Sequence, residues 1–297
     1  MAGIAPLVIS ASRRTDLPAF HADWFMDRLR RGHCVWTNPF NGKQKILVSF
    51  EKCRLIVFWS KNPAPMLPHL DEISARGIRF YFQFTLNDYV REGLEPHVPP
   101  LPQRIETFRR LSEKIGRERV LWRFDPVLTA GSLPPDELLR RIDALGRQLG
   151  AHTTKLVFSF ADIAVYARVA ANLARVCPSA REAAPEERLG FARQLAALNK
   201  NWQRRLVLAT CAGRDDFTML GIEKNRCIDG ELISTLCRGD EEILREYGAW
   251  PGQAKGGRRD RGQRAACGCA PSKDIGFYNS CRHGCAYCYA GHAFRAK

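Results

Sequence analysis

Six short apolar runs, separated by segments that read as helices, constrain the fold of this chain more than any other feature. The runs are rich in Val, Phe, Tyr and Trp, as β-strands are. They are PLVISAS (6–12), IVFWS (56–60), FYFQF (80–84), VLWRF (120–124), LVFSF (156–160) and LVLAT (206–210). Strands that alternate with helices pair in parallel through right-handed crossovers. The sequence therefore predicts an α/β fold, a partial or complete (β/α) barrel of about six parallel strands.

The segments between these runs carry the spacing and the end signals of helices. Gly32, Gly77, Gly116 and Gly150 stand where helix C-caps belong, and Pro134 and Pro135 open one helix. The expected helices cover 18–32, 65–77, 101–116, 134–150 and 185–202.

The 297 residues suit one structural domain with two parts. We expect residues 1–210 to form the barrel body. We expect residues 211–297 to form a cysteine-rich segment that packs on the barrel mouth and binds a metal cluster. Within that segment, residues 249–266 are rich in Gly, Arg and Lys without apolar periodicity, which predicts an exposed loop.

Each predicted strand ends in polar residues, and in parallel barrels the active site lies at the carboxyl ends of the strands. We therefore expect one polar pocket there. Its candidate residues are Arg13, Arg14, Asp16, Lys61, Asn62, Gln83, Arg123, Asp125 and Asp162.

Among these, Arg14 and Asp16 are the catalytic candidates, whereas Lys61, Asn62, Gln83, Arg123 and Asp125 are candidates for cofactor binding. Arginine clamps carboxylates or phosphates through two hydrogen bonds, although an Arg–Asp pair can equally brace a loop. Asp125 suits a ribose hydroxyl or an amino group of a cofactor, or the cap of the next segment.

The start of the chain lacks a basic stretch followed by a long apolar run, and no segment has the length of a membrane span. We therefore expect a cytoplasmic protein with no membrane partner. The net charge of +15 permits a nucleic-acid partner, but scattered arginines explain it as well. Eleven cysteines in a reducing compartment favour metal ligation or thiol chemistry over disulfides, and most of them lie after residue 200.

Three cysteines near the C-terminal end have close, regular spacing in CRHGCAYCYAGHA. Cys281, Cys285 and Cys288 could supply three thiolates to a cubane iron–sulfur cluster and leave one iron open. The alternative is a structural zinc site, which His283 and His292 would complete.

The CX3CX2C spacing resembles that of the radical S-adenosylmethionine superfamily, with Tyr287 at the aromatic position before the last cysteine. The resemblance implies a [4Fe–4S] cluster whose open iron binds S-adenosylmethionine, and reductive cleavage to a 5′-deoxyadenosyl radical. It implies an electron donor such as flavodoxin or ferredoxin, and it puts Tyr287 beside the adenine.

Longer phrases carry a second resemblance. SASRRTDLPAF, VFWSKNPAP, YFQFTL, RVLWRFDPVL and DIGFYNSCRHGCAYCYA, in this order, are similar to a bacterial family called domain of unknown function 1848. Its C-terminal cysteines are similar to the cluster motif that lies near the N-terminal side of ordinary radical S-adenosylmethionine domains. This implies a circularly permuted arrangement, in which the cysteine loop reaches the barrel mouth from the other end of the chain.

Four further cysteines, Cys211, Cys227, Cys267 and Cys269, suit a second [4Fe–4S] cluster, a zinc site with four cysteine ligands or no shared site. Cys34, Cys53, Cys177 and Cys237 lie singly in apolar elements and are expected to be buried thiols. The sequence thus favours an iron–sulfur, radical S-adenosylmethionine-type enzyme with an unknown substrate. The alternative is a basic, zinc-binding nucleic-acid-binding protein without radical chemistry.

Overall fold

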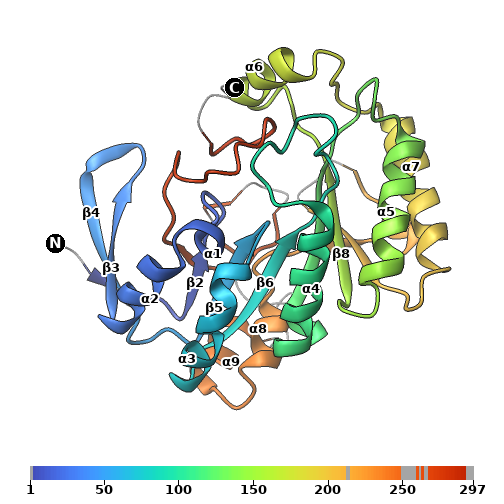
Figure 1. The fold of residues 1–297 in the computed structure, drawn as a ribbon. Coiled ribbons are helices and arrows are strands. Elements are labelled where there is room, and N and C mark those ends of the chain that lie inside the picture. Colours follow the sequence, from blue (N-terminus) through green and yellow to red (C-terminus); the bar gives the residue numbers. More distant parts are fainter. Residues whose placement is uncertain (1–2, 212–214, 249–258, 261, 264–266, 292–297) are drawn as a thin grey trace. The chain divides into compact units, whose positions relative to one another are not determined.

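The computed structural model describes residues 3–211, 215–248, 259–260, 262–263 and 267–291. Most of the predicted loop at 249–266, and His292, therefore lie outside the described residues. The described chain contains a large sheet, a small sheet and surrounding helices (Figure 1).

The large sheet contains eight strands in the order β10-β9-β8-β7-β6-β5-β2-β11. All six strands predicted from the apolar runs are present: β2 (Val8–Ala11), β5 (Leu55–Ser60), β6 (Arg79–Thr85), β7 (Val120–Val127), β8 (Lys155–Phe160) and β9 (Val207–Cys211). The neighbours β11–β2, β2–β5, β7–β8, β8–β9 and β9–β10 are parallel. This confirms the predicted α/β class and is consistent with a partial or complete β/α barrel.

Two short strands of this sheet were not expected, namely β10 (Glu223–Asn225) and β11 (Lys273–Asp274). Both are polar and too short to give an apolar pattern, so only their pairing reveals them. The small sheet was also not expected. It has the order β1-β4-β3, with β1 (Gly3–Ile4), β3 (His33–Asn38) and β4 (Asn41–Ser49).

By internal contacts the chain divides into two compact units, and residues 211–297 are shared between them. Unit 1 comprises 1–83 and 226–281, and unit 2 comprises 84–225 and 282–297.

Unit 1 packs short helices on strands β2, β5 and β6. Its helical elements are α1 (Leu17–Phe20), α2 (Ala22–Arg30), η1 (Ala64–His69), α3 (Leu70–Ala75), α8 (Gly230–Leu236) and α9 (Glu241–Tyr247). The predicted helix at 18–32 is interrupted at His21, and the one at 65–77 starts as a 3-10 helix containing Pro68. Aromatic rings fill the core: Phe58 stacks on Phe82 at 4.9 Å and meets Phe25 edge-on at 5.3 Å.

Unit 2 contains the longest helices. They are α4 (Leu101–Ile115), α5 (Pro135–Leu149), α6 (Ala167–Val176) and α7 (Pro185–Asn199), with 3-10 turns η2 (Arg117–Arg119) and η3 (Thr218–Leu220). The predicted helices at 101–116, 134–150 and 185–202 are confirmed, whereas α6 was not expected. Helices α5 and α7 lie side by side (Figure 1). Trp202 packs so closely against Gly146 of α5 that a Cβ there would lie 2.2 Å from the indole.

Candidate functional site

The carboxyl end of β2 is organised by a carboxylate that the sequence patterns did not single out. Asp274 of β11 accepts hydrogen bonds from the hydroxyls of Ser10 (3.2 Å) and Ser12 (2.8 Å) and from the Arg13 backbone N–H (3.0 Å). The Arg14 guanidinium lies 3.9 Å from the same carboxylate. The Arg14–Asp274 pair therefore braces the loop after β2, and the acid comes from the segment that leads to Cys281.

Asp16, the other catalytic candidate, is buried and accepts three hydrogen bonds. The Ser60 hydroxyl and the Lys61 N–H each donate to it over 2.7 Å, and the Ala19 N–H donates over 3.0 Å. Asp16 thus caps α1 and fixes the start of the loop after β5. These contacts are those of a carboxylate that joins two loops.

The cofactor-binding candidates of the β5 loop take part in the same turn. The Asn62 N–H donates to Ser60 Oγ over 2.9 Å, and the Asn62 side-chain oxygen accepts from the Ala64 N–H over 3.4 Å. Ser60, Lys61 and Asn62 are therefore ordered together at the carboxyl end of β5.

Three of the four additional cysteines come together in unit 1. The Cys269 side chain lies beside those of Cys227 and Cys267. The Cys269 sulfur also accepts hydrogen bonds from the N–H groups of Cys227 (3.2 Å) and Ile228 (3.5 Å). All three side chains are buried. We call these three residues the Cys227–Cys267–Cys269 cluster.

Arginine and amide groups surround this cluster. Burial acts to lower the pKa of Arg13, but negative charge at the nearby Cys227, Cys269 and Asp274 side chains holds it above its ordinary value. Gln83, which we predicted as a cofactor-binding residue, instead donates from its buried side-chain amide to the Cys227 carbonyl over 2.8 Å. The Tyr81 hydroxyl donates to the same carbonyl over 2.7 Å.

In unit 2, a second polar network occupies the carboxyl ends of β6 and β7. Asn87 donates to the Asp125 carbonyl over 3.1 Å, and its side-chain oxygen accepts from the Asp125 N–H over 2.9 Å. The Asp125 carboxylate accepts hydrogen bonds from Arg123 and from the Ser159 hydroxyl. Arg123 and Asp125, predicted from the phrase VLWRFDP, are thus joined. Asn87 is buried and lies just after β6.

Tyr287 enters this network from the cysteine loop. Its hydroxyl donates to Glu95, and Asn87 donates to that hydroxyl over 3.1 Å. Burial and the neighbouring Glu95 carboxylate raise the pKa of Tyr287 well above its ordinary value. Glu95 itself lies 3.7 Å from Arg104, and both side chains are fully buried. Tyr287 is therefore a neutral phenol held in a fixed position.

The loop that carries Cys285 and Cys288 is attached to the segment before α4. The Ala286 N–H donates to the Leu94 carbonyl over 2.9 Å. Within the loop, the Cys288 N–H donates to the Cys285 carbonyl over 3.1 Å and forms a turn. Gly284 has a φ of 66°, and a Cβ there would lie 3.2 Å from the His97 ring. Only glycine suits this close approach in the left-handed region.

Cys281 is placed in unit 1 by its neighbour Ser280. The Ser280 hydroxyl donates to Thr15 over 2.7 Å, and the Ser280 carbonyl lies 3.3 Å from a His21 ring nitrogen.

Cys211 is the last residue of β9 in unit 2, where it pairs with Asn225 of β10. Among the described residues, no group of three or more Cys, His, Asp or Glu side chains is arranged so that it could hold a metal ion.

The four cysteines expected to be inert are all buried. Burial raises the pKa of Cys53 to about 12 and those of Cys34 and Cys237 to about 11. At neutral pH these three are neutral thiols.

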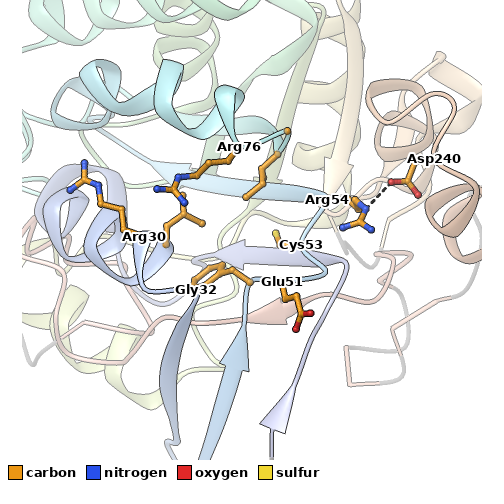
Figure 2. Close-up of a pocket in the computed structure, with 11 residues that line it drawn as sticks. Arg30, Gly32, Glu51, Cys53, Arg54, Arg76 and Asp240 are labelled. Atoms are coloured by element: carbon orange, nitrogen blue, oxygen red, sulfur yellow. Dashed lines mark hydrogen bonds and ion pairs between the residues drawn. The ribbon is translucent and has the colours of Figure 1, made fainter.

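A cavity of about 540 Å³ lies in unit 1, near the residues that precede β5 and β6 (Figure 2). Arg30, Arg54 and Arg76 line it, but each of them faces a carboxylate. Arg30 and Arg76 bind Glu72 at 2.6 and 3.1 Å, and Arg54 binds Asp240 at 2.9 Å. In parallel barrels this end of the strands serves stability. We assign the cavity no catalytic role.

The eight-stranded sheet and its flanking helices define an α/β protein, consistent with a partial or complete β/α barrel, with a cysteine-rich C-terminal segment. The chain belongs to the family described as domain of unknown function DUF1848, whose profile matches residues 8–290. No curated protein and no solved structure matches the chain. None of the described helices is long and apolar enough to cross a membrane.

Proposed function

We propose that this protein is a radical S-adenosylmethionine enzyme in which Cys281, Cys285 and Cys288 bind a [4Fe–4S] cluster. The observation that carries the proposal is the loop with the CX3CX2C spacing. The segment before Cys281 lies beside the carboxyl end of β2 in unit 1, and the segment after Cys285 contacts the carboxyl ends of β6 and β7 in unit 2. Three thiols and no fourth cysteine in the loop suit a cluster with one open iron.

The flank before Cys281 supports a permuted barrel. β11 pairs in parallel with β2, and the next residue, Ile275, donates to the Ser10 carbonyl over 3.1 Å. The chain then runs beside the loop after β2, where Ser280 contacts Thr15. In radical S-adenosylmethionine domains the cysteine loop follows the first strand. Here β11, the last of the described strands, precedes the cysteine loop and pairs with β2, which is what a permuted arrangement would require.

The flank after Cys285 supports a cofactor site at β6 and β7. Asn87 and Glu95 fix Tyr287, whereas a quarter of the Asp125 side chain is exposed. An exposed carboxylate that Arg123 and Ser159 hold in place can accept hydrogen bonds from the ribose hydroxyls or the amino group of S-adenosylmethionine. Arg123 and Asn87 would position that acid.

The bound cluster would supply one electron for reductive cleavage of S-adenosylmethionine to a 5′-deoxyadenosyl radical. The chain's own residues would orient the cofactor and exclude water. Reduction requires a one-electron donor, for which flavodoxin or ferredoxin is suitable. The substrate class stays open, and the charge of +15 allows an acidic metabolite or a nucleic acid.

The test is anaerobic purification and reconstitution, followed by reduction with dithionite in the presence of S-adenosylmethionine. We expect brown protein with at least about four irons per chain and formation of 5′-deoxyadenosine. Cys285→Ala should abolish the product and lower the iron content. Cys34→Ala, a matched change of a buried neutral thiol, should leave both intact.

Cluster-loaded, reduced protein that forms no 5′-deoxyadenosine would overturn the proposal. Colourless protein that contains zinc and binds nucleic acid would instead favour the zinc-binding alternative.

A further inference from the structure

The β3–β4 hairpin of unit 1 has an aromatic side chain at its tip. Asn38 pairs with Asn41, so Pro39 and Phe40 alone join the two strands. Phe40 is 89% exposed, more than any other large apolar side chain among the described residues. A single exposed apolar side chain needs no partner by itself, so what Phe40 can bind depends on its surroundings.

Hydrogen bonds hold the turn around Phe40 in one conformation. The Asn38 side chain accepts from the Phe40 N–H over 2.9 Å and donates to the Gln44 side chain over 2.6 Å. The Asn41 side chain accepts from the Lys43 N–H over 3.2 Å. The backbone that carries the ring is therefore ordered before a ligand binds, which lowers the entropy cost of binding.

One face of the hairpin packs against the rest of unit 1. Cys34 and Val48, which pair across the strands, are buried, and the Lys273 ammonium lies 3.3 Å from the centre of the Trp36 ring. These contacts anchor the hairpin at its base, whereas its tip extends away from the helices of unit 1 (Figure 1).

The opposite face of the hairpin is exposed and positively charged. Lys45 pairs with Thr37, and because side chains alternate along a strand, Lys43 and Val35 lie on the same face. All four of these residues are exposed. Residues 28–50 contain Arg and Lys but no Asp or Glu, so this part of the chain offers the two lysines no carboxylate.

We propose that the β3–β4 hairpin binds single-stranded nucleic acid, with a base stacked on Phe40 and neighbouring phosphates at Lys43 and Lys45. Aromatic side chains next to cationic ones are the arrangement with which proteins bind single strands, because bases stack on the rings and phosphates pair with the cations. The proposal does not depend on the cysteine loop at 281–288.

The small number of cations favours a single strand over a duplex. An unpaired base can stack on Phe40 directly, and such stacking strengthens binding by about 5- to 150-fold. In a duplex, an apolar side chain must first unstack a base step, at a cost of the same order. Two lysines at the tip offer little electrostatic attraction to offset that cost.

The experiment measures binding of the full-length protein to a fluorescein-labelled oligothymidylate by fluorescence anisotropy. Phe40→Ala should weaken binding by about 5- to 150-fold, and Phe40→Trp should retain it. Each phosphate contact on a single strand adds about 0.7 to the slope of log affinity against log salt, so replacing both Lys43 and Lys45 by Gln should reduce that slope by about 1.4.

Two matched controls lie in unit 2. Met219→Ala removes an apolar side chain that is 82% exposed, and Lys200→Gln removes an exposed lysine at the end of α7. Neither change should weaken binding of the oligothymidylate or alter its dependence on salt.

The Phe40→Trp protein gives a second measurement in a variant that keeps an aromatic ring at the tip. The fluorescence of the added tryptophan should be quenched when the oligothymidylate binds, because the indole stacks on a base. No quenching at saturating oligothymidylate would overturn the placement of a base on the hairpin.

Failure of this proposal and failure of the function proposed above are distinguishable. Cys285→Ala should bind the oligothymidylate as the wild type does. Phe40→Ala should keep its iron and, without oligonucleotide, form 5′-deoxyadenosine at the wild-type rate.

Four results would overturn the proposal. They are wild-type affinity in Phe40→Ala, binding of a duplex as tight as that of the single strand, competition by polyglutamate as effective as that by unlabelled oligothymidylate, and a protein dimer that Phe40→Ala dissociates without a change in oligonucleotide affinity. The last result would assign the hairpin to contact between two copies of this chain.

Discussion

Replacing Asp16 distinguishes a carboxylate that holds the loops from one that takes part in chemistry. Asp16 is 6% exposed, and its carboxylate accepts hydrogen bonds from Ser60, Lys61 and Ala19. Asp16→Ala would leave a buried hydroxyl and two N–H groups without this acceptor. Asp16→Asn keeps one acceptor oxygen but turns an N–H donor toward a group that itself donates.

The expected loss follows from these contacts. A hydrogen bond to a charged group is worth about 1.5–3 kcal/mol, and a lost helix cap costs about 0.5–2 kcal/mol. Since such contributions are not additive, we expect Asp16→Ala to lower the free energy of unfolding by about 3–5 kcal/mol. Asp16→Asn, which loses one N–H partner, should lower it by about 1–3 kcal/mol.

The assay is urea unfolding at neutral pH, followed by tryptophan fluorescence. Asp23→Asn is the matched control, because Asp23 lies in the first turn of α2 with its side chain fully exposed. It should change the free energy of unfolding by no more than about 0.5 kcal/mol. If Asp16→Ala were as mild as this control, the bracing role of Asp16 would be refuted, and its carboxylate would return as a catalytic candidate.

Two further predictions concern unit 2. Gly146→Ala should lower the melting temperature and reduce the free energy of unfolding by at least about 1 kcal/mol. The new Cβ would lie 2.2 Å from Trp202, and the cost of this overpacking exceeds the gain in helix propensity. An unchanged or higher melting temperature would contradict this. Hydrogen bonds from Arg140 and Arg141 lower the pKa of Glu137 to about 2, so its stabilisation is complete above about pH 4.5 and is lost as the pH falls toward 2. Urea titrations between pH 2 and 6 should therefore show a weaker pH dependence for Glu137→Gln, and an unchanged slope would count against the interaction.

The sequence predicted the repetitive part of the fold well. The six apolar runs became six strands because burial on a parallel sheet selects Val, Phe, Tyr and Trp locally. The hairpin β3–β4 was missed, although NPFNG at 38–42 is a turn signal between two runs of strand-forming residues. Strand β11 has two polar residues and no such signal.

At the candidate site, the sequence predicted residue types and their strand ends but not their partners. It pointed to Arg14 and Asp16 as a pair, whereas Arg14 lies near Asp274 and Asp16 joins Ser60 and Lys61. Asp274 is more than 250 residues away along the chain. No local pattern encodes such a contact, because pairing between distant segments is set by the order of strands in the sheet.

For the cysteines too, some relationships follow from the sequence and others only from the tertiary structure. Sequence alone determined that Cys281, Cys285 and Cys288 share one loop, since covalent connectivity keeps residues so close in the chain near one another. Only the tertiary structure decided which other cysteines meet. It brings Cys227 to Cys267 and Cys269 across some forty residues, and it places Gln83 and Arg13 around them. Long-range convergence of this kind depends on how strands and loops pack, which spacing along the chain does not specify.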